Sequence, residues 1–134
     1  MNPLHPAQVV LVTVKRITDQ HGKPSYQFSY TTPNGTSLPN GTVEFTEAGH
    51  LWYLLANSTS DNITFDGISI QNAGSQIGGL WENSNAIRLD NHCSKNSKID
   101  IELGFIDDKD GLQKSFSSPD PQIINVPGKL GGGD

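Results

Sequence analysis

Residues 90–93 (Asp-Asn-His-Cys) place three possible metal ligands within four positions. Carboxylate, imidazole and thiolate groups are the side chains that bind zinc in proteins. Adjacent side chains of a strand point to opposite faces, however, so a closed site would need further ligands from distant histidines such as His50. The paired spacing of a zinc site is also missing. We therefore interpret this segment as a turn at a strand end and expect neither a metal nor a cofactor.

An acidic turn at Asp107, Asp108 and Asp110 has the composition of a calcium loop. An EF-hand loop that began at Asp108 would place Leu112 at its fifth position and Pro119 at its twelfth. Those positions require an oxygen ligand and a bidentate glutamate. The calcium motif therefore fails, and the acidic residues are interpreted as a solvated turn.

Nucleophilic or acid–base catalysis has little support in the sequence. Cys93 is the single cysteine, and neither it nor a serine lies in a nucleophile motif such as G-x-S-x-G. Asp100 and Glu102 share one face of a predicted strand and could do acid–base work, but the solvent face of an alternating strand explains them equally well. No catalytic residue is therefore assigned, and a non-enzymatic protein is favoured over an enzyme of unrecognised type.

A glycine-rich segment, residues 78–85, surrounds an indole with carboxylate and amide groups. An aromatic ring can stack on a sugar while polar neighbours hydrogen-bond the hydroxyls. A large aromatic side chain in a long loop can instead plug the end of a β-sandwich. Both interpretations stay open, and we expect the indole to be partly exposed. The candidate ligand-binding residues are Trp81, Glu82, Asn83 and Asn85.

The elements that position these residues are predicted to be strands. Apolar and β-branched residues alternate with polar ones between Asn-Gly, Asp-Gly and proline-rich turns. Residues 71–85 are predicted to be a long loop, and Trp52 and Tyr53 are expected in the core. The pattern indicates an all-β fold, a two-sheet antiparallel β-sandwich that is immunoglobulin-like, with about eight short strands. Strand-like patterns occupy residues 9–17, 25–31, 42–46, 50–56, 62–65, 68–70, 86–90, 98–107, 112–116 and 122–126.

Length and composition indicate one acidic, loop-rich domain. A chain of 134 residues can bury a substantial core. A net charge of -5 leaves no basic stripe for phosphates, which argues against nucleic acid and membrane surfaces as partners. We expect an extended segment over residues 1–8, a single sandwich domain over 9–127 and a flexible glycine-rich tail over 128–134.

The start of the chain, residues 1–8, lacks the cationic and apolar regions of a signal peptide. No apolar run reaches the length of a membrane span. A single cysteine also leaves no intrachain disulfide. Together these features predict a cytoplasmic location.

The segment 116–127 (FSSPDPQIINVP) is the stiffest part of the sequence. Pro119 and Pro121 remove two backbone donors and push the residues before them toward extended conformations. Asp120 can accept a hydrogen bond from the Gln122 amide. We therefore predict a device that aims the last strand, running along a sheet edge or between sheets, rather than a ligand site. The residues of this structural motif are Pro119, Asp120, Pro121, Gln122 and Asn125.

Together with the strand before it, this ending resembles the DP-EP family of small bacterial proteins. The resemblance lies in residues 105–127, which read as a strand, an Asp-Gly turn, Ser-Pro-Asp-Pro and a short Ile/Asn strand. The family name suggests a second acidic-proline pair, and Val126 and Pro127 stand in its place. The resemblance supplies no catalytic residue.

The sequence as a whole favours a non-catalytic protein that acts through a binding or self-association surface. Its partner would be another protein or a second copy of the chain. A carbohydrate-binding module that uses the Trp81 loop is the alternative, and an enzyme of unrecognised type is the third possibility.

Overall fold

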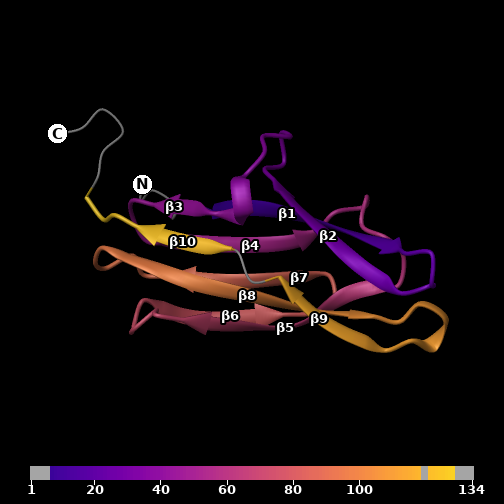
Figure 1. Ribbon diagram of the computed structural model, residues 1–134. Coiled ribbons are helices and arrows are strands. Elements are labelled where there is room, and N and C mark those ends of the chain that lie inside the picture. Colours follow the sequence, from indigo (N-terminus) through magenta and orange to yellow (C-terminus); the bar gives the residue numbers. More distant parts are fainter. Residues whose placement is uncertain (1–6, 119–120, 129–134) are drawn as a thin grey trace.

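The computed structural model of the protein describes residues 7–118 and 121–128. These residues form ten β-strands and two single-turn 3-10 helices (Figure 1). Parts of the predicted N-terminal segment, Pro-Asp-Pro motif and tail, namely residues 1–6, 119–120 and 129–134, lie outside the described residues. The elements are β1 (Ala7–Thr18), β2 (Pro24–Thr31), η1 (Pro39–Gly41), β3 (Val43–Phe45), β4 (Gly49–Leu55), β5 (Ile63–Gln71), β6 (Ile77–Glu82), β7 (Ala86–Asn91), β8 (Ser97–Asp107), η2 (Lys109–Gly111), β9 (Lys114–Ser118) and β10 (Gln122–Asn125).

The strands form two sheets that pack as a sandwich. The first sheet has the order β2-β1-β4-β7-β6, and the second has the order β3-β10-β8-β5, with β9 also paired to β8. The expected all-β sandwich is confirmed, with ten described strands in place of about eight. Pairing is mixed rather than antiparallel throughout, because β1 pairs with β4 and β10 with β3 in parallel. The chain leaves the first sheet to form β3 and re-enters it as β4, and such a crossover permits parallel neighbours.

The core lies between the two sheets and follows from strand alternation. In β1, Val10, Val12 and Val14 are fully buried, while the residues between them face outward. Each such side chain contributes about 1.5–3 kcal/mol when it leaves water. The facing strand β8 contributes Ile99, Ile101, Leu103 and Phe105.

Two predictions about aromatic residues and loops are wrong. Tyr53 is fully buried as expected, but Trp52 points to the outer face of the first sheet and is only partly buried. Neighbouring residues of a strand face opposite ways, so one of these two had to point outward. The predicted loop over 71–85 also contains the strand β6, because its two glycines conceal the strand pattern.

The end of the chain runs along one side of β8 in two steps. Ser118 of β9 pairs with Leu103, whereas Gln122 of β10 pairs with Asp100. Both strands therefore pair with the same neighbour, β9 with its later residues and β10 with its earlier ones. The strand β10 lies inside its sheet, between β8 and β3. The predicted bond from the Gln122 amide to Asp120 lies outside the described residues, while Pro121 O accepts a 2.9 Å hydrogen bond from Ile101 N.

Candidate functional site

The outer face of the first sheet carries a patch of aromatic and charged side chains, which we call the tryptophan patch: His50, Trp52, Trp81, Arg88 and Asp90. Strand register brings them together, because Trp52 and Trp81 both pair with Arg88, and His50 pairs with Asp90. Residues that pair directly across neighbouring strands point to the same face. The patch therefore spans β4, β7 and the edge strand β6.

The two indoles are in contact and one of them is open to solvent. The ring centroids of Trp52 and Trp81 lie 5.8 Å apart at an interplanar angle of 63°, an edge-to-face arrangement. Arg88 Cζ lies 5.8 Å from the Trp52 ring centroid, within the range of a cation–π contact. Trp81 remains 45% exposed. The patch thus lies on paired strands and has one accessible ring.

Beside the indoles, Asp90 lies within ion-pair distance of two basic side chains. His50 Nδ1 lies 2.7 Å from Asp90 Oδ1, and Arg88 Nε lies 3.3 Å from the same oxygen in an ion pair. All three side chains are 34–41% exposed. A small cavity of about 220 Å³, which His50, Asp90 and His92 help to line, adjoins the patch. The arrangement offers fixed hydrogen-bonding groups to a ligand that rests on Trp81.

The glycine pair at the start of β6 makes room for these groups. A Cβ at Gly79 would lie 2.5 Å from Asp90 Oδ2, and a Cβ at Gly78 would lie 2.1 Å from His92 Nε2. Both approaches are closer than a side chain permits. The glycines that suggested a loop therefore allow Asp90 and His92 to lie over the edge strand.

Of the four predicted ligand-binding residues, only Trp81 belongs to the tryptophan patch. Glu82 is exposed at the end of β6. Because it follows Trp81 directly in the strand, its side chain points to the opposite face of the sheet. Asn83 Oδ1 accepts hydrogen bonds from the amides of Asn85 and Ala86, so it builds the β6–β7 turn. The other members, His50, Trp52, Arg88 and Asp90, were not predicted to belong to a ligand-binding surface, although their i, i+2 spacing within β4 and β7 placed each pair on one strand face.

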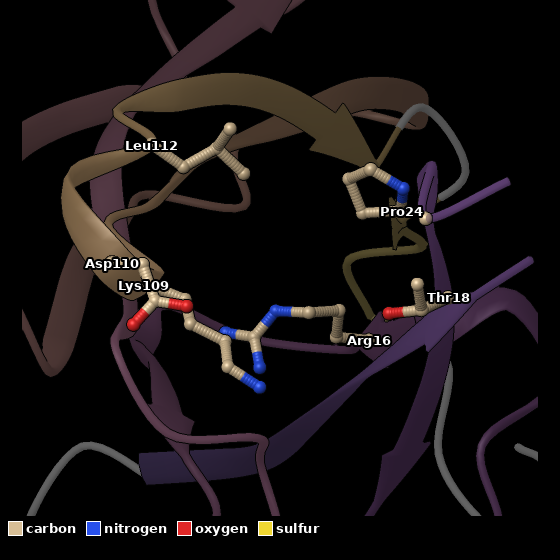
Figure 2. Close-up of a pocket in the computed structure, with 7 residues that line it drawn as sticks. Arg16, Thr18, Pro24, Lys109, Asp110 and Leu112 are labelled. Atoms are coloured by element: carbon tan, nitrogen blue, oxygen red, sulfur yellow. The ribbon is translucent and has the colours of Figure 1, made fainter.

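A second cavity, of about 340 Å³, lies between the β1–β2 hairpin and η2. Figure 2 shows Arg16 and Lys109 on one side of it and the apolar Pro24 and Leu112 on another. Arg16 belongs to a buried network that joins the sheets. The contacts and pKa values of this network limit the chemistry that the cavity could support.

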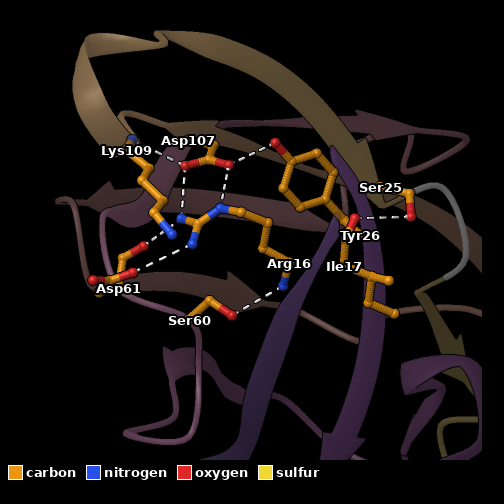
Figure 3. A network of polar contacts seen from close by, with 8 residues as sticks. All are labelled: Arg16, Ile17, Ser25, Tyr26, Ser60, Asp61, Asp107 and Lys109. Carbon is orange, nitrogen blue, oxygen red and sulfur yellow. Dashed lines mark hydrogen bonds and ion pairs between the residues drawn. The ribbon is translucent and has the colours of Figure 1, made fainter. Parts of the chain in front are cut away.

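We call this network the ionic cluster: Arg16, Tyr26 and Asp107 (Figure 3). Asp107 is fully buried, which contradicts its expected place in a solvated turn, while Asp108 and Asp110 are exposed. Arg16 donates to Asp107 from Nε at 2.7 Å and from a terminal nitrogen at 2.8 Å. Tyr26 Oη donates to Asp107 Oδ2 at 2.6 Å. Asp107 therefore has its charge balanced and its lone pairs satisfied.

Titration of the ionic cluster is displaced away from neutral pH. The hydrogen bonds from Arg16 hold the pKa of Asp107 down at about 2. Burial, with the bond to Asp107, raises the pKa of Tyr26 to about 12, and Asp107 raises the pKa of Arg16. A general acid or base works best with a pKa near the operating pH. These groups thus keep their protonation states and serve to join β1 and β2 to β8.

A neutral network joins the sheets at the other end of β8. We call it the amide cluster: Gln76, Asn91 and Asn125, all of them buried. Asn125 Nδ2 donates to Asn91 Oδ1 and Gln76 Oε1 at 3.0 Å each, and Asn91 Nδ2 donates back to Asn125 Oδ1 at 2.8 Å. Asn125 of the predicted C-terminal motif is therefore a cross-sheet anchor. Gln122 of the same motif bonds Asp100 on the neighbouring strand at 2.8 Å.

The possible metal ligands of residues 90–93 are separated by the fold. Asp90 and His92 lie on the outer face, whereas Cys93 is buried and its Sγ donates to Phe45 O at 3.4 Å. Burial raises the pKa of the Cys93 thiol. Within residues 7–118 and 121–128, no three His, Cys, Asp or Glu side chains are placed to hold a metal ion.

Within the described part of the chain, no helix has the length and apolar character that a membrane crossing requires.

Comparison with known proteins places the chain in a family. No curated protein matches the sequence. The model of the DP-EP family matches residues 8–127, far more than the C-terminal segment that carried the resemblance. The chain therefore belongs to the DP-EP family.

Proposed function

We propose that this protein is a non-catalytic binding protein and that the tryptophan patch is its contact surface. The observation that carries the proposal is the exposure of Trp81, 45%, beside a second indole and a fixed His50–Asp90 pair. Aromatic residues on a rigid surface with a few placed polar groups are typical of binding sites. The ionic cluster, whose groups are saturated, offers no comparable set.

A carbohydrate is the ligand class that suits this chemistry best. The open face of Trp81 can stack on the apolar face of a sugar ring. Asp90, His50 and Arg88 then supply an acceptor and donors for hydroxyl groups. The acidic net charge of -5 disfavours polyanionic ligands.

Intrinsic fluorescence tests this proposal directly, because the chain has two tryptophans and both lie in the patch. Soluble oligosaccharides of glucose, galactose and N-acetylglucosamine would be titrated into the protein. We expect a saturable change in indole emission with at least one of them. Calorimetry should then show that Trp81→Ala no longer binds that sugar. Leu112→Ala, at an equally open position far from the patch, should bind as wild type. Unchanged binding by Trp81→Ala, or no saturable response to any sugar, would refute carbohydrate binding here.

A further inference from the structure

The edge strand β6 leaves a core-facing apolar side chain uncovered. Leu80 pairs with the fully buried Leu89 and so points to the inner side of the first sheet. It is nevertheless 49% exposed, because β6 is the last strand of its sheet. Its neighbour Trp81 is 45% exposed on the outer side. Large apolar groups are therefore open on both faces of one edge.

The backbone of this edge is also available. Asn83 N donates to Ala86 O at 2.9 Å, which marks the first hydrogen-bonded pair of the β6–β7 hairpin. Hydrogen-bonded and non-hydrogen-bonded pairs alternate along an antiparallel ladder. The N–H and C=O groups of Glu82 and Leu80 therefore point away from β7. Among the described residues, no strand pairs with that side of β6.

Other sheet edges carry features that discourage pairing with a second chain. The edge of β2 is bridged by its own loop, where Leu38 N donates to Tyr30 O. The strand β5 is interrupted by a register shift between Phe65 and Ile68, and β3 has only three residues. In β6 the register shift comes at its start, and residues 79–82 continue without proline, lysine or arginine. Proteins normally protect a sheet edge with such residues or distortions.

We infer that two copies of this chain associate through antiparallel pairing of their β6 strands, about a two-fold axis at Leu80. In this register the outward-pointing backbone groups of the two Leu80 residues meet. The two Leu80 side chains cover each other on the inner side. On the outer side, Trp81 of each copy lies opposite Gly79 of the other, which has no side chain of its own, and beside the Asp90 carboxylate that lies over this glycine.

Charge favours this register as well. Glu82 is the only charged residue of β6, and it would lie opposite Gly78 of the second copy rather than opposite the second Glu82. A two-fold axis makes the contact self-limiting, because each edge is used once and no free edge of the same kind remains. The first sheets of the two copies would join into one continuous sheet, with both tryptophan patches on the same face.

Such an interface is short, so we expect a weak, concentration-dependent dimer. Sedimentation equilibrium of the full chain without any ligand, over a wide range of protein concentration, should show a monomer–dimer equilibrium. Leu80→Lys places a charge on the edge and should reduce the association constant at least tenfold, with an unchanged far-UV circular dichroism spectrum. Leu112→Lys is the matched control, because Leu112 is also 49% exposed and lies near η2. It should dimerise as wild type.

A wild-type protein that stays monomeric throughout would overturn this inference. So would equal dimerisation by Leu80→Lys and wild type, or equal loss in the Leu112→Lys control. The outcome is separable from the proposed function, because sugar binding is measured on Trp81→Ala and dimerisation is measured on Leu80→Lys without sugar.

Discussion

The ionic cluster and the amide cluster join the same two sheets at opposite ends of β8, but with different chemistry. In the ionic cluster, a fully buried carboxylate is held by Arg16, whose side chain is only 8% exposed. In the amide cluster, Asn91 and Asn125 exchange neutral hydrogen bonds. Removing one partner of a buried ion pair leaves an unbalanced charge, whereas removing an amide leaves only an unsatisfied dipole. The two ends should therefore respond differently to mutation and to pH.

The largest effect is expected from Asp107→Asn. The substitution removes the buried counter-ion of Arg16 and leaves only the exposed Asp61 carboxylate beside it, which should lower the free energy of unfolding by about 3–5 kcal/mol. Urea denaturation would measure this loss. Asp61→Asn is the control, because Asp61 pairs with the same arginine but its side chain is 77% exposed. That change should cost about 1 kcal/mol or less, and equal losses from the two variants would contradict the account of the ionic cluster.

Acid should weaken the ionic end selectively. The pKa of Asp107 is about 2 in the folded protein, below its ordinary value of 3.8. A carboxyl group whose pKa is lower in the folded protein than in the unfolded chain stabilises the fold at pH values above its unfolded-state pKa. This stability is lost as the pH falls from about 4 toward 2. This difference between the two pKa values corresponds to about 2.5 kcal/mol of the free energy of unfolding. Urea midpoints measured at a series of pH values should show this loss in wild type. The loss of stability over the same pH range should be smaller in Asp107→Asn.

A smaller effect is expected at the amide end. Asn125→Ala leaves the amides of Asn91 and Gln76 short of partners, which should lower the free energy of unfolding by about 2 kcal/mol. Because no group of the amide cluster titrates, the difference from wild type should be the same at pH 7 and at pH 4. A pH-dependent difference would mean that the two ends are not chemically distinct.

The smallest effect is expected from Cys93→Ser, beside the amide cluster. Cys93 N donates to Asn91 Oδ1 at 3.1 Å, and this backbone bond does not depend on the side chain. A serine hydroxyl can also replace the thiol as donor to Phe45 O. We expect a loss of about 1 kcal/mol or less by thermal or urea unfolding. A loss of several kcal/mol would show that the thiol itself supports this end.

These contrasts also mark what the sequence could and could not predict. Alternation predicted the β-sandwich and the burial of Tyr53, since a period of two residues assigns faces within a strand. It could not predict which strands become neighbours. Arg16 and Asp107 are 91 positions apart, and only the packing of the two sheets brings them together. An acidic turn was therefore the natural interpretation of Asp107.

The tryptophan patch was hidden for the same reason. Trp81 stood out because of its glycine-rich surroundings, but its partners come from β4 and β7 and meet only through strand register. Gly78 and Gly79 were misleading, because their role is to admit Asp90 and His92 above a strand. Local sequence motifs cannot reveal a surface to which each of three strands contributes only one or two residues.

The most direct test of the central claim asks which surface of the molecule responds to ligand. A mixture of the soluble oligosaccharides would be titrated into ¹⁵N-labelled protein, and the backbone amide and indole N–H chemical shifts would be recorded. The proposed function predicts saturable shifts in β4, β6 and β7 and in both indole signals. Shifts confined to the cavity beside Arg16, or no saturable shift at all, would contradict the assignment of the tryptophan patch as the binding surface.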